Sequence, residues 1–420
     1  MTLKSLFFEG SNEKTAFWSK PPADKITFGL IELEKNFSCK LVERFPVPTI
    51  DATLSNQVLE QKDGQPVNGL FLMGTATNKG SYISFSLENA TGTFEGRQWI
   101  NGDADLQLEK LNQQSIVSIT AKLNEFPKKS GRFSLMCSAI KPADYNDDTA
   151  LLQRQMPDDT PQAIVDEFFF YISLLSKPFQ NTTFYLLDDL WADFSLRYGA
   201  KGHHHNYRMG LLQHTTEVMR IAYHIHQHAE NPTSLATYLN IITRTFQSLD
   251  WKKMLTDLTP QTAYKKTAPN ETSNHIAELS QRILTTSITE PLSLDTLLFG
   301  IIFHDIGKII EYSSVGDESG DKYKRWFGDN FEVPHHRAGA IDMDVLGKRF
   351  GHIQLGVMYI SRQMYQNNTE LSLNDWLDTL AVIQSHHYKP EWGSPVVPRT
   401  TVEFVVHLAD FIDARIASEF

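Results

Sequence analysis

The pattern of apolar positions changes its period along the chain. Between residues 66 and 142 apolar and polar residues alternate as in half-buried strands, whereas from about residue 161 apolar residues recur at helical spacing. The strand-like runs are Leu70–Thr77, Tyr82–Leu87, Gly92–Trp99, Ile116–Leu123 and Phe133–Ile140. The helix-like runs are Ala163–Leu175, Phe184–Tyr198, Met209–His228, Asn274–Thr285, Leu294–Tyr312, His352–Gln366, Trp376–His387 and Val402–Ala417. The pattern predicts a multidomain α+β protein with a β-rich N-terminal region and an all-α C-terminal domain.

Residues 1–65 precede both regions and carry no motif. Ile26–Phe45 contains two apolar runs that we interpret as one or two strands, so we expect a β-rich segment of unknown role. The predicted boundaries are then 66–142 for the β-domain, 143–160 for a linker and 161–420 for the helical domain, with polar or charged stretches that look inserted near 230–290 and 313–345.

The order of the elements in residues 66–142 is typical of an OB-fold barrel. Five strands are predicted, and a helix-compatible stretch, Ala104–Leu111, falls between the third and the fourth. Such barrels bind single strands by stacking bases on aromatic side chains beside a basic groove. The residues available for this are Tyr82, Phe85, Trp99, Lys128, Lys129 and Arg132. For any one aromatic residue a place in the barrel core is the commoner role, but the domain as a whole predicts nucleic-acid binding.

Composition and charge narrow the class of protein. With 41% apolar and 21% charged residues the chain is typical of a globular protein. Its two cysteines, Cys39 and Cys137, exclude a thiolate zinc cluster and suit a reducing, cytoplasmic compartment. No apolar run approaches the roughly 18 residues of a membrane span. The net charge of −11 argues against coating nucleic acid by bulk charge, although residues 66–142 carry an excess of basic side chains.

The dipeptide His304-Asp305 is the first sign of chemistry. It lies with Lys308 in the apolar run Phe299–Ile310, so an imidazole, a carboxylate and an ammonium are expected to be buried together. Their burial is costly without compensation, and a divalent metal would provide it.

Further imidazoles and carboxylates occur in apolar helical contexts. They are His214, His352, His386, His387 and Asp410. Singly, each is more often a satisfied core residue or a solvated surface residue. Together, and without thiols, they suit Mn²⁺, Fe²⁺, Co²⁺, Ni²⁺ or Zn²⁺ in an open catalytic site.

The order of these residues resembles that of the HD superfamily of metal-dependent phosphohydrolases. The narrower resemblance is to the YhaM-type 3′-5′ exoribonucleases, which join an N-terminal OB-fold to a C-terminal HD domain. Three segments carry it: HHHNYRMGLLQH at 203–214, HDIGK at 304–308, and SHHYKPEWGSP at 385–395 leading into HLADFIDAR at 407–415. The resemblance covers roughly residues 66–142 and 160–420.

The resemblance implies a two-metal site. One ion would be held by His214, His304, Asp305 and Asp410, and the other by Asp305, His352 and His386, with His387 in the same shell. A bridging role suits Asp305, because a carboxylate has two oxygens and can serve two cations about 3.5–4 Å apart. Lys308 lies three residues later on the same helical face and would contact the phosphate. Asp305 and Lys308 are thus the expected catalytic residues, and His204, His205 and Arg415 are expected at the substrate rim.

The expected function is that of a metal-dependent 3′-5′ exonuclease. It would hydrolyse single-stranded RNA or DNA to 5′-mononucleotides through a water activated by two divalent ions, with Mn²⁺ expected and Co²⁺, Fe²⁺, Ni²⁺ or Mg²⁺ as alternatives. A cyclic-dinucleotide or nucleotide phosphohydrolase of the HD type shares the ligand order, but the barrel favours a polymer. A nucleic-acid-binding protein with a relic HD domain is the non-enzymatic alternative. The expected partner is a single strand and not a membrane, and homo-oligomerisation is left open.

Overall fold

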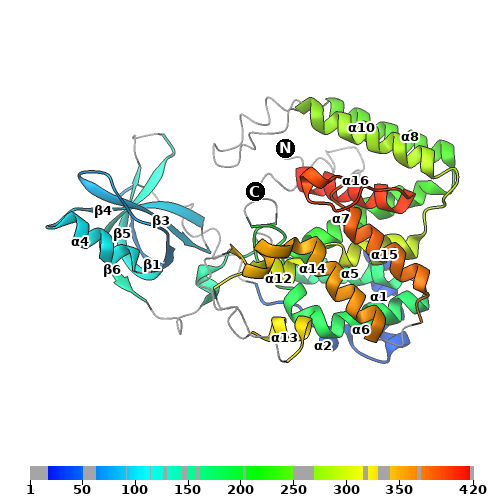
Figure 1. Ribbon diagram of the computed structural model, residues 1–420, viewed down its shortest axis with the longest axis horizontal. Coiled ribbons are helices and arrows are strands. Elements are labelled where there is room, and N and C mark those ends of the chain that lie inside the picture. Colours follow the sequence, from blue (N-terminus) through cyan, green and yellow to red (C-terminus); the bar gives the residue numbers. More distant parts are fainter. Residues whose placement is uncertain are drawn as a thin grey trace.

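The computed structural model places a β-barrel beside a larger helical body (Figure 1). It describes residues 18–50, 63–90, 92–113, 115–125, 130–143, 149–156, 160–201, 205–248, 269–315, 320–329, 341–366 and 370–416. Among these residues, no helix combines the length and the apolar character needed to cross a bilayer.

The barrel is a closed sheet whose topology is consistent with an OB-fold. Its elements are β1 (Pro66–Met73), β2 (Thr77–Asn78), β3 (Tyr82–Asn89), β4 (Gly92–Trp99), α4 (Ala104–Asn112), β5 (Ile116–Glu125) and β6 (Phe133–Pro142). The strands follow the order β1-β5-β6-β4-β3-β2, and an additional β1–β3 pairing closes the barrel. The β4–β6 pair is parallel and the other pairs are antiparallel. The predicted OB-like barrel is therefore confirmed, with α4 between its third and fourth long strands.

Alternate side chains fill the interior of the barrel. Ile83, Phe85 and Leu87 of β3 are buried, as expected for one face of a strand. A Cβ atom at Gly96 would lie 2.3 Å from the Phe85 ring, so the glycine lets that ring lie against the backbone of β4. Phe85 is only 3% exposed, and the prediction that it stacks on a base is wrong because the ring belongs to the core.

The helical body surrounds one continuous apolar core. Its elements are α5 (Pro161–Ser173), α6 (Lys177–Phe194), α7 (Gly210–Ala229), α8 (Pro232–Ser248), α10 (Pro269–Thr286), α11 (Leu294–Phe303), α12 (Lys308–Glu311), α13 (Asp321–Phe327), α14 (Val345–Gln366), α15 (Leu373–Ser385) and α16 (Thr401–Ile416), with the short pair β7 (Tyr312–Ser313) and β8 (Asp342–Met343). The helix α11, which is buried from Thr296 to Phe303, contacts α6, α7, α15 and α16.

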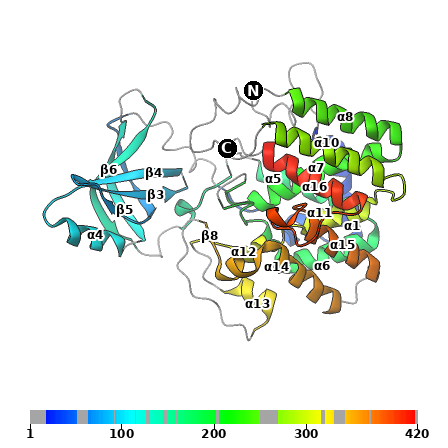
Figure 2. The same cartoon turned by 45° about the horizontal axis from the view of Figure 1, so that its top comes forward.

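The stretches that looked inserted contain regular elements. The polar stretch near 230–290 contributes α8 and α10, which lie side by side and pack on α7 and α16 in both views (Figures 1 and 2). The apolar pattern had not identified α8. The stretch near 313–345 contributes α13 and the β7–β8 pair.

The N-terminal segment differs from the prediction of strands. Its described residues form α1 (Ala23–Phe37) and α2 (Leu41–Arg44), and α1 packs against α5. Leu33 and Phe45 are buried in the core of the helical body, and the Trp191 indole donates a hydrogen bond to the Pro46 carbonyl at 2.9 Å. The β-rich interpretation of Ile26–Phe45 is therefore wrong. The barrel is inserted between the first helices of the helical body and the rest.

Residues 149–156 connect the barrel to the helical body by specific contacts. Leu152, in the 3-10 turn η2 (Thr149–Leu152), packs in a small apolar cluster with Leu72, Ile116 and Val315. The Arg154 guanidinium donates to the Thr93 hydroxyl at 2.9 Å and lies 3.3 Å from a Glu88 oxygen. The described part of the predicted linker is thus packed against both halves.

Candidate metal centre

The HD dipeptide lies where the predicted long helix breaks. The run Leu294–Tyr312 was expected to form one helix, but α11 ends at Phe303 and α12 begins at Lys308. A Cβ atom at Gly307 would lie 1.9 Å from the His352 carbonyl oxygen, so this glycine allows α14 to approach the break closely. The break and this contact bring residues of α11, α12 and α14 to one centre.

One oxygen of Asp305 faces a first group of ligand atoms. Its Oδ2 lies 3.2 Å from His214 Nε2, on α7, and 3.4 Å from His304 Nε2. Oδ1 of Asp410, on α16, lies 3.2 Å and 3.9 Å from the same two nitrogens. The two imidazoles and Asp410 offer ligand atoms that all lie within 4.8 Å of one another.

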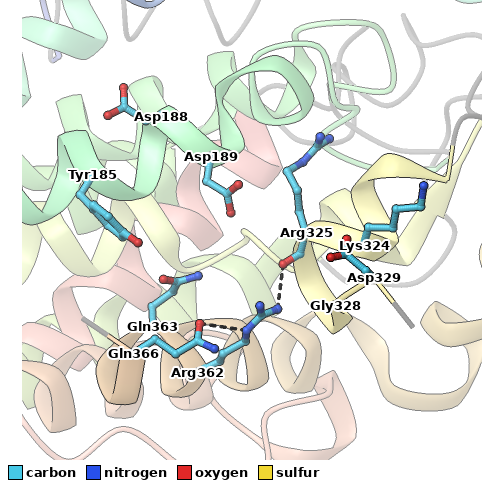
Figure 3. Close-up of a pocket in the computed structure, with 10 residues that line it drawn as sticks. All are labelled: Tyr185, Asp188, Asp189, Lys324, Arg325, Gly328, Asp329, Arg362, Gln363 and Gln366. Atoms are coloured by element: carbon cyan, nitrogen blue, oxygen red, sulfur yellow. Dashed lines mark hydrogen bonds between the residues drawn. The ribbon is translucent and has the colours of Figure 1, made fainter. Parts of the chain in front are cut away.

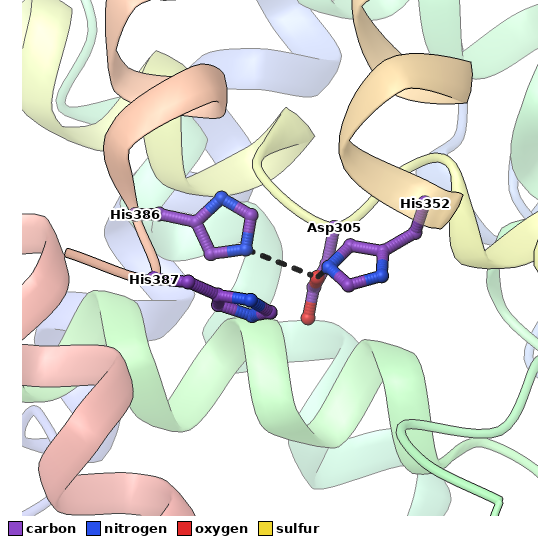
Figure 4. Close-up of side chains that lie close together, drawn as sticks. All are labelled: Asp305, His352, His386 and His387. Carbon is purple, nitrogen blue, oxygen red and sulfur yellow. Dashed lines mark ion pairs between the residues drawn. The ribbon is translucent and has the colours of Figure 1, made fainter. Parts of the chain in front are cut away.

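The other oxygen of Asp305 faces a second group (Figure 4). Its Oδ1 lies 3.4 Å from His352 Nε2 and 3.6 Å from His386 Nε2. His387 completes this set, whose ligand atoms also lie within 4.8 Å of one another. The structure thus brings together all seven residues that the sequence suggested as metal ligands.

Buried polar atoms at this centre fit a cation. Asp305 Oδ1, His352 Nε2 and His386 Nε2 are buried and make no hydrogen bond to any residue that the structure describes. An unsatisfied buried donor or acceptor costs on the order of 1–3 kcal/mol. A shared metal ion would satisfy all three atoms at once, and imidazole with carboxylate is a suitable ligand set for the ions named above.

All five candidate histidine ligands make a hydrogen-bond contact through their other ring nitrogen, and backbone carbonyls orient three of them, His304, His386 and His387. Nδ1 of His304 lies 2.7 Å from the Ile301 carbonyl, and Nδ1 of His386 lies 2.7 Å from the Ile383 carbonyl. Each Nδ1–H that donates in this way leaves an Nε2 lone pair directed at the centre, which is the usual arrangement of metal-binding histidines.

The other two histidines, His214 and His352, are oriented by carboxylates that the sequence did not indicate as part of the site. Nδ1 of His214 lies 2.7 Å from Asp413 Oδ2, and Nδ1 of His352 lies 3.1 Å from both Glu311 oxygens. The only signal in the sequence was helical spacing, because Asp413 follows Asp410, and Glu311 follows Lys308, by three residues.

Burial and charge set the protonation of the centre. Burial lowers the pKa of His304 to about 4, so its imidazole is neutral at pH 7 and free to act as a ligand. Burial also lowers the pKa of Lys308, but Asp305, whose Oδ2 lies 2.6 Å from the ammonium, raises it by more, and the net pKa is above the ordinary value. The centre therefore contains a neutral imidazole and a permanently charged ammonium.

The residues expected at the substrate rim fall in different places. His205 is buried, with Nε2 3.0 Å from Asp413 Oδ2 and Nδ1 2.8 Å from the Tyr207 hydroxyl. Its assignment to the rim is wrong, because its ring lies behind His214 and shares the same carboxylate. Arg415 lies on the last turn of α16, and His204 is outside the described residues.

On the barrel, Tyr82 and Trp99 form a surface pair. They face each other across β3 and β4 with ring centroids 6.1 Å apart, and Trp99 is 56% exposed. The Arg97 guanidinium lies 5.3 Å from the centre of the Tyr82 ring. Arg132 is exposed near the start of β6, whereas Lys128 and Lys129 lie outside the described residues.

A separate cavity of about 500 Å³ opens between α6, α13 and α14 (Figure 3). Three of its charged side chains already have partners: Asp188 pairs with Arg44, Asp189 accepts from the Tyr359 hydroxyl, and Arg362 donates to two backbone carbonyls. We assign no ligand to it.

The fold and the site define a class of protein. It combines an OB-like barrel with a helical body that holds a buried histidine–aspartate cluster able to bind metal. No protein-family model matches the chain, and no solved structure matches it significantly.

Curated proteins named 3′-5′ exoribonuclease YhaM are similar to it along most of their length. The protein of Shouchella clausii is 25% identical over 375 residues, which is 86% of this chain and 88% of the relative. The protein of Bacillus licheniformis is 22% identical, covering 82% of this chain and 81% of the relative. That of Oceanobacillus iheyensis is 21% identical, covering 86% and 88%. These comparisons confirm the resemblance to YhaM-type proteins indicated by the motifs.

Proposed function

We propose that the chain is a metal-dependent 3′-5′ exoribonuclease that releases 5′-mononucleotides from single-stranded RNA, and that its helical body is an HD-superfamily domain. The observation that carries this proposal is the placement of Asp305, whose two oxygens face two separate groups of imidazoles. The similarity of the chain to proteins named as 3′-5′ exoribonucleases supplies the substrate class and the direction.

The geometry supports a proposal of two ligand sets. One ion would be held by His214, His304, Asp305 and Asp410, and the other by Asp305, His352 and His386, with His387 beside it. Divalent ions held by these residues would lower the pKa of a bound water and offset the charge of a phosphate, and Mn²⁺ is the ion that we propose.

The residues of the chain position the substrate. The Lys308 ammonium has three donors and uses one toward Asp305, so it can also donate to a phosphate oxygen. Lys308 is 7% exposed, and this exclusion of bulk water strengthens the attraction between its ammonium and an anionic substrate. Lys308 therefore acts in this proposal as a charge partner of the scissile phosphate.

The barrel would hold the strand upstream of the cut. We propose that Tyr82 and Trp99 stack on bases and that Arg97 and Arg132 contact the backbone of the strand, with Lys128 and Lys129, which lie outside the described residues, as further candidates for that contact. A barrel of this kind suits a polymer. It gives no support to a cyclic dinucleotide as the substrate, and the intact ligand geometry gives none to a relic domain.

A nuclease assay with end-labelled strands tests the proposal. A single-stranded RNA labelled at its 3′ end should release labelled mononucleotide from the first time point with Mn²⁺, and EDTA should stop the reaction. Parallel reactions with Mg²⁺ or Co²⁺ would show which ion supports cleavage, and a reaction with a DNA strand would show whether the enzyme requires ribose. Internal cleavage products, or release that EDTA does not affect, would contradict the proposal.

A further inference from the structure

A set of aromatic rings lies beside the metal centre and belongs to none of the roles above. Trp392 closes the short 3-10 turn η3 (Pro390–Trp392), Phe411 lies on α16, and His275 lies on α10. The Trp392 and Phe411 rings are nearly parallel, with centroids 6.1 Å apart, and the His275 ring contacts both edge-on at 5.0 and 4.9 Å. We call these three residues the aromatic wall.

The aromatic wall is joined to the proposed metal ligands by short contacts. Nδ1 of His387 lies 2.9 Å from the Trp392 carbonyl, and Phe411 directly follows Asp410. His275 Nε2 lies 2.9 Å from His407 Nε2, and Nδ1 of His407 lies 2.6 Å from the His386 carbonyl. The wall therefore flanks the site from three different elements.

Two cations lie over the rings of the wall. The Lys389 ammonium is 4.2 Å from the centre of the Trp392 ring, and the Arg415 guanidinium is 4.7 Å from the centre of the Phe411 ring. Such contacts hold a cation over an aromatic face. Positive charge is thus placed on the aromatic wall, beside the residues that neighbour the proposed metal ligands.

Packing in the apolar core explains the presence of an aromatic ring at Phe411, but it does not explain the exposed ring of Trp392. Phe411 is 8% exposed and belongs to the apolar core, whereas Trp392 is 39% exposed. The turn that carries Trp392 ends at Gly393, which has a φ of 103° that a residue with a side chain rarely adopts. The turn keeps a large aromatic ring at the surface, next to the centre.

We propose that the aromatic wall is a nucleotide subsite: the Lys389 ammonium moves from the Trp392 ring to an adjoining phosphate, which Arg415 also contacts, and Trp392 stacks on the base of one of the two nucleotides that flank the scissile phosphodiester. The inference rests on the proposed nuclease function. It gives α10, from a stretch that the sequence left without a role, a supporting part in the subsite, because His275 packs against the Trp392 ring. Base–aromatic stacking tolerates every base, so the subsite selects for a nucleotide without selecting a sequence.

The test couples a protein variant to a change in the RNA. Trp392→Ala is compared with wild type on a single-stranded RNA and on two versions that lack one base, at the terminal or the penultimate position. Trp392→Ala should lower kcat/KM on intact RNA by about tenfold to a hundredfold, the size expected for one stacked base. On the RNA without the stacked base, wild type should fall by a similar factor and Trp392→Ala should fall no further.

Matched variants separate stacking from other effects. Trp392→Phe keeps an aromatic face and should retain most of the activity and the sensitivity to base removal. Tyr365→Ala removes an aromatic ring that is 84% exposed on α14, away from the wall, and should behave as wild type. Lys389→Met should weaken RNA cleavage and reduce its dependence on salt concentration.

The outcomes distinguish this inference from the proposed function. If wild type releases no mononucleotide, the proposed function fails. If wild type is active but Trp392→Ala and base removal lower kcat/KM independently, their factors multiply at the terminal and at the penultimate position. In that case the nucleotide subsite is refuted, but the proposed nuclease function is not. A matching loss of bound Mn²⁺ in Trp392→Ala and Trp392→Phe would also refute it, because the side chain would then serve the metal centre.

Discussion

Glu311 tests whether the two groups of imidazoles are separate ligand sets. It is 6% exposed, and it accepts hydrogen bonds from the Nδ1–H and the backbone N–H of His352, each at 3.1 Å. A carboxylate in this position typically contributes about 10- to 100-fold to metal affinity, or roughly 1.4–2.7 kcal/mol. Glu311→Ala removes both hydrogen bonds, so we expect it to lower the metal affinity by about 100-fold. Glu311→Gln should lower the metal affinity by about 10-fold.

Substitution of Glu311 should weaken the binding of only one of the two ions. His352 contacts the Asp305 oxygen of the second group, whereas His214 and His304 contact the other oxygen. Asp413 gives the mirror experiment, because it orients His214 at 2.7 Å, and Asp413→Ala should weaken the other ion.

Equilibrium dialysis against Mn²⁺ with metal analysis measures the expectation directly. Wild type should bind two ions per chain, Glu311→Ala should keep one with unchanged affinity, and the control Glu32→Ala, an exposed carboxylate on α1, should match wild type. Thermal melting of each metal-free variant shows whether it is folded. Equal weakening of both ions in Glu311→Ala, or no weakening, would refute the division into two sets.

Asp305→Ala should abolish RNA cleavage while leaving strand binding to the barrel intact, and more than a few per cent of residual activity in a radiolabel assay would exclude the bridging role. Trp99→Ala should weaken binding of single-stranded RNA by about 1–3 kcal/mol in fluorescence anisotropy, the value of one stacked base. Unchanged affinity would show that Trp99 does not stack on a base. In the wild-type structure the Arg220 guanidinium donates to both oxygens of the fully buried Glu167, at 2.5 and 2.6 Å, and Arg220→Met leaves this carboxylate without its cation. Urea unfolding should then show a loss of about 3–5 kcal/mol, and a loss below about 1 kcal/mol would contradict this. Cleavage lost to EDTA should return when Mn²⁺ is added in excess.

The sequence predicted most elements because burial imposes a period on it. The strand pattern of the barrel was clear since one face of each strand is buried, as in Tyr82–Asn89. The segment Ile26–Phe45 was misread because Ile26, Leu30 and Leu33 are spaced for a helix, while the β-branched and aromatic residues between them suit a strand. Only the packing of α1 on α5 decides between the two.

The candidate ligands were predictable, but the groups that orient them were not. The order of the histidines and aspartates resembles that of the HD superfamily, so His214, His304 and Asp410 could be named from the sequence. His205 follows two other histidines and was expected at the substrate rim, but it is 2% exposed and its ring contacts Asp413. Such contacts depend on which helices lie together, and one sequence does not contain that information.

The insertion of the barrel between α2 and α5 has a consequence for biosynthesis. The strands of the barrel are contiguous in sequence, so the barrel can close as soon as β6 has left the ribosome, whereas α1 has to wait for α5 before its apolar face is covered. A fragment that starts after the barrel would lack Trp18, Leu33 and Phe45, all fully buried in the helical core. The helical half therefore cannot be obtained whole by cutting the chain at the end of the barrel.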